Sequence, residues 1–117
     1  MLLAVFIIFR YINCSMEAAE VIRKLSGMRM AVTFFRLAKG RQPADIGEAI
    51  QNGNLEAVPQ IKLNWHLASS KVRKAAELIV RDTGGWGYVN NPASRDFGTI
   101  FIDCAHKDPK GRYWSEF

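Results

Sequence analysis

The chain has 117 residues, of which 49% are apolar and 23% are charged. This length allows one compact domain and excludes a large enzyme, and the composition excludes a disordered tail, a collagen-like fibre and a membrane bundle. Sixteen Lys and Arg residues against eleven Asp and Glu give a net charge of +5, which favours a phosphate-bearing partner.

The first apolar segment, residues 2–9, is short and rich in Val, Ile and Phe, which is typical of a strand buried on both faces. Arg10 ends the segment well before the ~20 apolar residues that a membrane-spanning helix needs. Neither a basic start nor a small-residue cleavage site marks a signal peptide. We therefore expect residues 1–15 to form an appended N-terminal strand on a cytoplasmic protein that has no membrane partner.

A helix is predicted directly after this segment. Ser15 is a good N-cap, and Glu17 near the start and Lys24 near the end complement the helix dipole. Gly27 is expected to end the helix. The next segment, 28–38, is ambiguous, because its apolar residues fit both the alternation of a strand and one face of a helix.

Glycine and proline residues then divide the middle of the chain into short predicted elements. Gly40 ends the ambiguous segment under either interpretation. Pro43 suits the first turn of a short helix over residues 44–51, which Asn-Gly-Asn at 52–54 would terminate. Apolar residues alternate over 61–65, which predicts a short extended run.

A longer helix is predicted over residues 69–82. Ser69 or Ser70 provides its N-cap, and the pair Gly84-Gly85 stops it. Apolar residues recur at the spacing of an inward-facing helical stripe: Val72, Ala75, Ala76 and Ile79.

The C-terminal third has the pattern of strands and turns. Residues 86–90 and 97–104 are predicted to form an antiparallel hairpin, joined by a loop over 91–96. A turn over 108–111 precedes a third short strand over 112–114. The predicted class is a small single α+β domain with two to four helices and a C-terminal antiparallel hairpin or sheet.

The charges are unevenly distributed along the chain. Residues 21–41 carry six basic side chains and no acidic one, and residues 62–81 carry five basic side chains against one acidic. Between them, residues 42–61 carry three acidic side chains and no basic one. This pattern predicts a basic surface for nucleic-acid phosphates, DNA rather than RNA, although an ordinary solvated surface accounts for the charges equally well.

The order of a short helix, a basic helix and a hairpin is similar to that of a winged helix-turn-helix domain. The similarity covers at most residues 28–104, and about sixteen residues separate two helices that the motif joins by a turn of 3–4. Cations in the first turn of the basic helix oppose its dipole, and a bound phosphate would offset this cost. Nucleic-acid contacts are assigned to Arg36, Lys39, Arg41, Lys71, Arg73, Lys74 and Arg95.

A small protein-binding module, either an inhibitor or an assembly subunit, is the alternative function. Its apolar strand over 2–9 or its aromatic C-terminal hairpin would pair with a partner, and a second copy of the chain would make a homodimer. Trp86, Tyr88 and Phe101 in the hairpin fit a platform for unpaired bases, but the core beneath a helix is the preferred interpretation.

A catalytic site is not expected. One cluster of side chains able to bind a metal lies where the last long strand ends: Asp103, Cys104, His106 and Asp108. A structural zinc site normally needs four N or S ligands, and the spacing of Cys14 and His66 to this cluster matches no ligand pattern. We predict a binding protein with no metal, no cofactor and no catalytic residue, in which both cysteines are buried free thiols.

Overall fold

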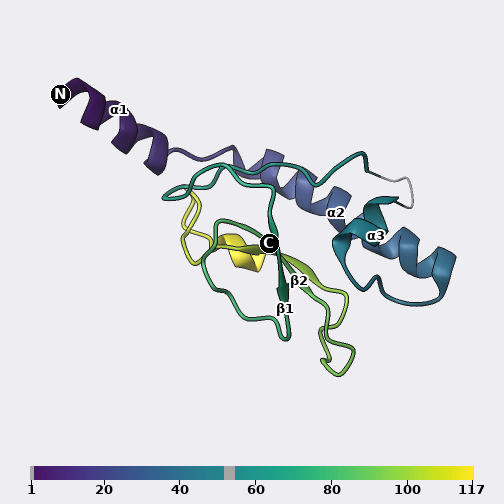
Figure 1. The fold of residues 1–117 in the computed structure, drawn as a ribbon. Helices are drawn as coiled ribbons and strands as arrows, with labels where there is room; N and C mark the ends of the chain where they lie inside the picture. The colour runs from purple at the N-terminus through teal and green to yellow at the C-terminus, as the bar shows by residue number, and fades with distance from the viewer. Residues whose placement is uncertain (1, 52–54) are drawn as a thin grey trace.

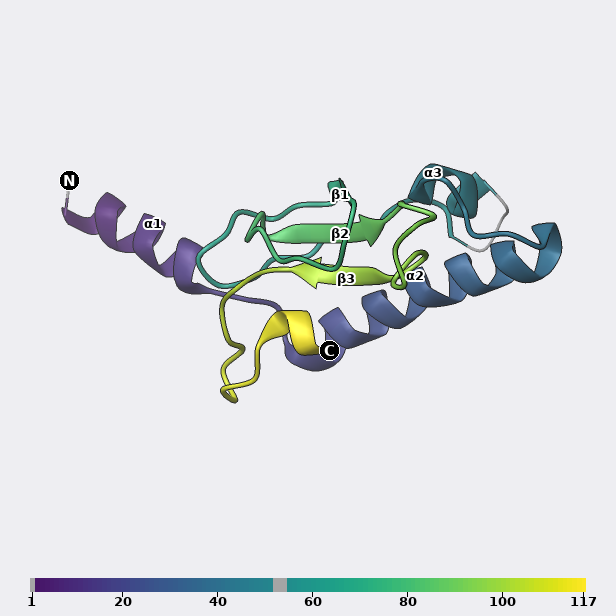
Figure 2. The same cartoon turned by 90° about the horizontal axis from the view of Figure 1, so that it is seen from below.

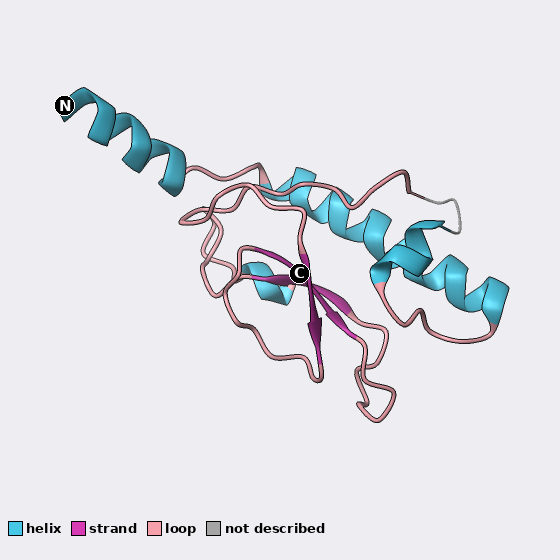
Figure 3. Cartoon of the chain, viewed as in Figure 1, coloured by secondary structure: helices cyan, strands magenta, loops and turns pink. Residues whose placement is uncertain are grey.

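The computed structural model describes residues 2–51 and 55–117 and has a long helix packed against a three-stranded sheet (Figure 1 and Figure 3). The elements are α1 (Leu2–Asn13), α2 (Ala18–Lys39), α3 (Ile46–Ala49), β1 (Val72–Ala75), β2 (Gly85–Val89), β3 (Ile100–Asp103) and the 3-10 helix η2 (Trp114–Glu116). The predicted α+β class is confirmed. Of the helices in the described ranges, none is both long enough and apolar enough to cross a membrane. The expected terminator at 52–54 lies outside the described residues.

The predicted C-terminal hairpin is present as β2 and β3. The strand order is β1-β2-β3, with β1 parallel to β2 and β2 antiparallel to β3. Trp86 stands opposite Ile102 in the hairpin register. The third strand expected over 112–114 is wrong: Tyr113 forms only an isolated bridge with Lys107, and η2 follows directly.

Helix α2 is one continuous helix through the segment that the sequence left ambiguous. Gly27 lies inside it and does not end it, so that prediction is wrong. A glycine costs about 1 kcal/mol within a helix, and burial of Leu25 and Met28 on either side of it outweighs that cost. The helix ends where Gly40 adopts a left-handed conformation with φ 72° and its N–H donates to the carbonyl of Arg36 at 2.8 Å.

The core lies between α2 and one face of the sheet (Figure 2). The buried stripe of α2 meets a set of large side chains from β2 and β3: Trp86, Tyr88, Ile100 and Ile102. A smaller cluster of Ala75, Val89 and Phe101 occupies the other face. The aromatic residues of the hairpin therefore serve the core, as preferred from the sequence, and are closed to stacking with bases.

Residues 2–13 form helix α1, so the N-terminal strand expected within 1–15 is wrong. A strand can satisfy its backbone N–H and C=O groups only by pairing with a neighbour, whereas a helix satisfies most of them within its own segment. The sheet consists of β1, β2 and β3, and residues 2–13 join neither of its outer strands. In the sequence, a short apolar run fits a buried strand and a helix equally well.

Residues 69–82 do not form the predicted basic helix. Strand β1 occupies 72–75, and an irregular connection over 76–84 leads to β2. Side chains alternate between the two faces of a strand, so Val72 packs towards the main core while Ala75 joins the smaller cluster. The recognition helix of a winged helix-turn-helix and its phosphate-binding N-terminus are therefore absent from this segment. Because this segment is not helical, its basic side chains do not face an unfavourable helix dipole.

Replacing Tyr88 by phenylalanine is expected to lower the free energy of unfolding by about 1–2 kcal/mol. The buried hydroxyl donates to the carbonyl of Pro43 at 2.6 Å, and burial raises the pKa of Tyr88 to about 12. Without the hydroxyl, that carbonyl stays in the interior without its donor. Urea unfolding measures the loss, with the exposed Tyr113→Phe as control. Equal stability of the two variants would contradict the prediction.

Candidate functional site

Helix α1 projects from the body of the protein (Figure 1 and Figure 2). Its apolar side chains are exposed to solvent. Eight of its twelve residues are large apolar or aromatic residues that are at least half exposed: Leu2, Leu3, Val5, Phe6, Ile7, Ile8, Phe9 and Tyr11. With 3.6 residues per turn, a nearly unbroken run of such residues covers the whole circumference. A helix that is apolar all round is normally buried, so the exposure of α1 is unusual for such a sequence.

The C-terminal end of α1 is anchored to the body by Lys62 and Trp65. The Lys62 ammonium donates to the carbonyls of Ile12 at 3.3 Å and Cys14 at 2.6 Å, which satisfies acceptors at the helix end and complements its dipole. Burial lowers the pKa of Lys62. The Trp65 ring meets Phe9 edge to face, with centroids 5.8 Å apart. The C-terminal turn of the helix is therefore attached to the body of the protein.

A second apolar surface lies along the outer side of α2. Met30, Phe34 and Leu37 are 54%, 43% and 72% exposed. Their i, i+4, i+7 spacing places them on one face, and that face is turned away from the buried stripe of the same helix. We call α1 together with these three residues the apolar helical surface.

Three of the basic residues predicted to bind nucleic acid lie around the C-terminal end of α2. Arg36 and Lys39 are exposed on the helix itself. Arg41 follows the helix, where its guanidinium pairs with Glu48 at 3.2 Å and lies over the Phe35 ring at 5.1 Å. Of these three side chains, Arg41 is engaged by an acidic neighbour.

The other four lie on β1, just before it, and in the β2–β3 loop. Lys71 and Lys74 are exposed, and Arg95 is exposed in the loop. Arg73 points to the face opposite Lys74 and pairs with buried Asp103, at 2.9 Å from Nε to a carboxylate oxygen. The strand therefore separates cations that a helix would have gathered, and nucleic-acid binding stays a prediction from the charge distribution.

Asp103 organises the connection over 76–84. Its buried carboxylate accepts hydrogen bonds from Arg73, from the Thr83 hydroxyl at 2.7 Å and from the Arg81 amide at 2.7 Å. Burial by itself raises the pKa of Asp103, but these donors outweigh it and hold the pKa below its ordinary value. The charge is therefore retained inside the fold, where it ties β1, β3 and the connection together.

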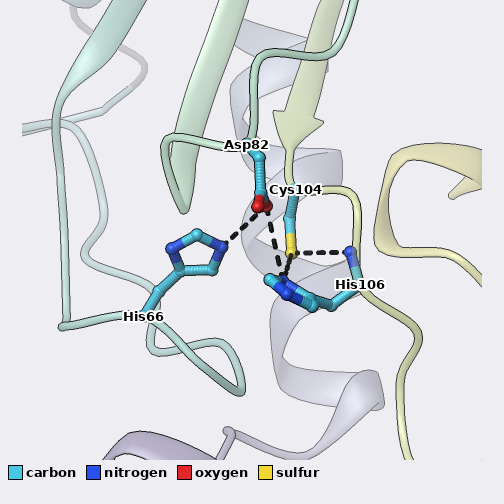
Figure 4. Close-up of side chains that lie close together, drawn as sticks. All are labelled: His66, Asp82, Cys104 and His106. Carbon is cyan, nitrogen blue, oxygen red and sulfur yellow. Dashed lines mark hydrogen bonds and ion pairs between the residues drawn. The ribbon is translucent and has the colours of Figure 1, made fainter.

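A second polar cluster lies at the same end of the sheet and consists of His66, Asp82, Cys104 and His106 (Figure 4). Asp82 Oδ1 lies 2.8 Å from His66 Nε2 and 3.4 Å from His106 Nδ1, and Cys104 Sγ lies 3.5 Å from the same His106 nitrogen. One potential ligand atom from each residue falls within 4.8 Å of all the others.

The electrostatics of this cluster differ between its two acidic groups. Burial raises the pKa of Asp82, but the Ala105 amide and His66 outweigh it and lower that pKa, so the carboxylate is charged. Burial raises the pKa of the Cys104 thiol to about 11. A nucleophilic cysteine needs a lowered pKa, so this thiol is unsuited to nucleophilic catalysis in spite of its histidine neighbour.

Two of the four residues in this cluster were already grouped as potential metal ligands in the sequence. Cys104 and His106 belong to it, whereas Asp103 turns towards Arg73, and Asp108 accepts hydrogen bonds from backbone amides of its own turn. His66 and Asp82 join from distant loops, and no local spacing signals this.

The expectation of two buried free thiols is correct for Cys104, but Cys14 is exposed. An apolar N-terminal strand would have covered Cys14, and the segment is instead a projecting helix.

Scans of the chain against protein-family models, curated proteins and solved structures find no match.

Proposed function

We propose that this protein is a non-catalytic assembly subunit that associates with further copies of its own chain through α1. The observation that carries the proposal is the exposure of eight large apolar side chains around that helix. Burying one such side chain contributes about 1.5–3 kcal/mol. A few of them together match the cost of association, about 4–15 kcal/mol, so packing α1 against its neighbours is enough to hold copies together.

The distribution of apolar residues around α1 favours several identical helices as its neighbours. A groove on a partner covers one side of a helix, whereas a bundle of helices covers all sides. Residues 2–9 carry no charge that would repel an identical helix, and Arg10 lies near the anchored end with its guanidinium over the Phe6 ring. The exposed stripe of α2 is a second apolar face, in the C-terminal half of that helix.

Sedimentation velocity over a range of protein concentrations tests the proposal. The wild-type chain is expected to form a discrete species several times heavier than the 13.2 kDa monomer. The double variant Ile7→Asp/Ile8→Asp is expected to sediment as a monomer, because association would bury two unpaired carboxylates. Its near-ultraviolet circular dichroism should match that of the wild type, since neither residue belongs to the core.

The matched control is Ile7→Leu/Ile8→Leu, which changes the same positions and keeps their apolar area. It should assemble as the wild type does. A wild-type chain that stays monomeric at every concentration, or an aspartate variant that assembles normally, would show that α1 is not the interface.

A further inference from the structure

We propose that His66, Asp82, Cys104 and His106 form a structural zinc site. The four side chains supply two imidazole nitrogens, one sulfur and one carboxylate oxygen, and Zn²⁺ takes all three kinds of ligand in tetrahedral sites. The inference is independent of the proposed assembly, because none of these residues lies on the apolar helical surface.

Two pairs of ligand atoms already have the spacing that a tetrahedral ion needs, and all four atoms lie within 4.8 Å of one another. Zinc bonds of about 2.0–2.3 Å imply ligand atoms about 3.3–3.6 Å apart. His106 Nδ1 lies 3.5 Å from Cys104 Sγ and 3.4 Å from Asp82 Oδ1. His66 Nε2 is closer to Asp82, at 2.8 Å, and a side-chain movement of about half an ångström would open that pair to the distance a shared ion needs.

The surroundings already orient these ligands. The Ala105 amide donates to Asp82 Oδ1 at 2.9 Å, the kind of outer contact that fixes metal-binding carboxylates. Gly84 has φ 81°, and a Cβ at that position would overlap the His66 ring, so only glycine leaves room for the imidazole. His66 is largely buried, with 12% of its side chain exposed.

The charges of the cluster also suit a divalent cation. Without an ion, a single oxygen of Asp82 holds both imidazoles and an amide, while the Cys104 thiol stays neutral in a buried position. Zinc would displace the thiol proton to solvent, and the resulting thiolate together with Asp82 would balance its two positive charges. Four protein ligands leave no open coordination position, so the site would be structural and not catalytic.

The ion would join three segments that are far apart in the sequence. His66 lies in the loop before β1, Asp82 in the connection before β2, and Cys104 and His106 directly after β3. Zinc would therefore close this end of the sheet and stabilise the folded chain over the unfolded one.

Calorimetric titration of the chelator-treated, full-length chain with zinc chloride tests the site. One zinc ion per chain is expected, with a higher thermal midpoint and no comparable effect of Mg²⁺ or Ca²⁺. Cobalt added in place of zinc should give a thiolate-to-metal charge-transfer band. Cys104→Ser and His106→Gln should each weaken zinc binding about tenfold or more, since even outer-contact losses cost about 10–100-fold.

The matched control is Cys14→Ser, which removes the exposed cysteine and should bind zinc as the wild type does. His106 is one-third exposed, so its variant tests the site even if the substitution at buried Cys104 prevents folding. The assignment is overturned if the wild type binds no zinc, if Cys14→Ser removes the cobalt–thiolate band, or if His106→Gln binds zinc with unchanged affinity.

Discussion

Replacing Asp103 by asparagine is expected to lower the free energy of unfolding by about 3–5 kcal/mol, because removing one partner of a buried ion pair leaves the other uncompensated. The carboxylate is fully buried and holds Arg73, Arg81 and Thr83. An amide supplies neither the charge nor enough acceptors for these donors. For a domain of this size, such a loss lowers the thermal midpoint by about 10 °C or more.

Thermal and urea unfolding of the variant measure this effect, with the exposed Glu77→Gln in the neighbouring connection as control. The pH dependence gives a second check. Because the folded pKa of Asp103 lies below its unfolded value near 3.9, its contribution is present above about pH 4 and is lost as the pH falls through the folded pKa. The unfolding free energies of the wild type and of the Asp103→Asn variant, plotted against pH, should therefore converge in acid. A constant gap between them would mean that the charge is not what stabilises the fold.

Truncating Trp114 to alanine is expected to cost about 3–5 kcal/mol of unfolding free energy, the range for large aromatic residues in a core. The ring is fully buried, its Nε1 donates to Asn64 Oδ1 at 2.8 Å, and its backbone N–H donates to the carbonyl of His106 at 3.2 Å. Removing the indole therefore leaves a cavity and an acceptor without its donor where the C-terminal segment joins the body.

Urea unfolding is the measurement for this variant as well. The neighbouring Tyr113→Ala is the control, because Tyr113 is 42% exposed, and its truncation should change stability by only about 0.5 kcal/mol. If both truncations had the same small effect, η2 would be a surface element that does not contribute to the core.

The sequence predicts those elements whose pairing is local. The hairpin of β2 and β3 is found where turn residues and alternation place it, and α3 lies within the predicted short helix. Local signals are weaker where tertiary packing decides. Gly27 is typical of a helix end, yet the buried stripe of α2 continues past it. The apolar spacing from Val72 to Ile79 fits a helix, although Val72–Ala75 pairs with β2 and the residues after it are irregular.

The candidate sites show the same division. The apolar run of α1 is conspicuous in the sequence, but its helical conformation and its exposure are visible only in the structure. Cys104 and His106 are two residues apart and stand out locally, whereas His66 and Asp82 reach them only through the three-dimensional arrangement of loops. Arg73 could not be recognised as an internal partner of Asp103 before the strand alternation was known.

The parallel pairing of β1 with β2 has a consequence for the order of folding events. A hairpin closes a short loop, whereas a parallel neighbour must wait for its connection to turn back along the sheet. Here the connection over 76–84, which leads from β1 back to β2, is held by Asp103 of β3. We therefore expect β2 and β3 to join early and β1 to dock late, once the carboxylate that receives Arg73 is already in place.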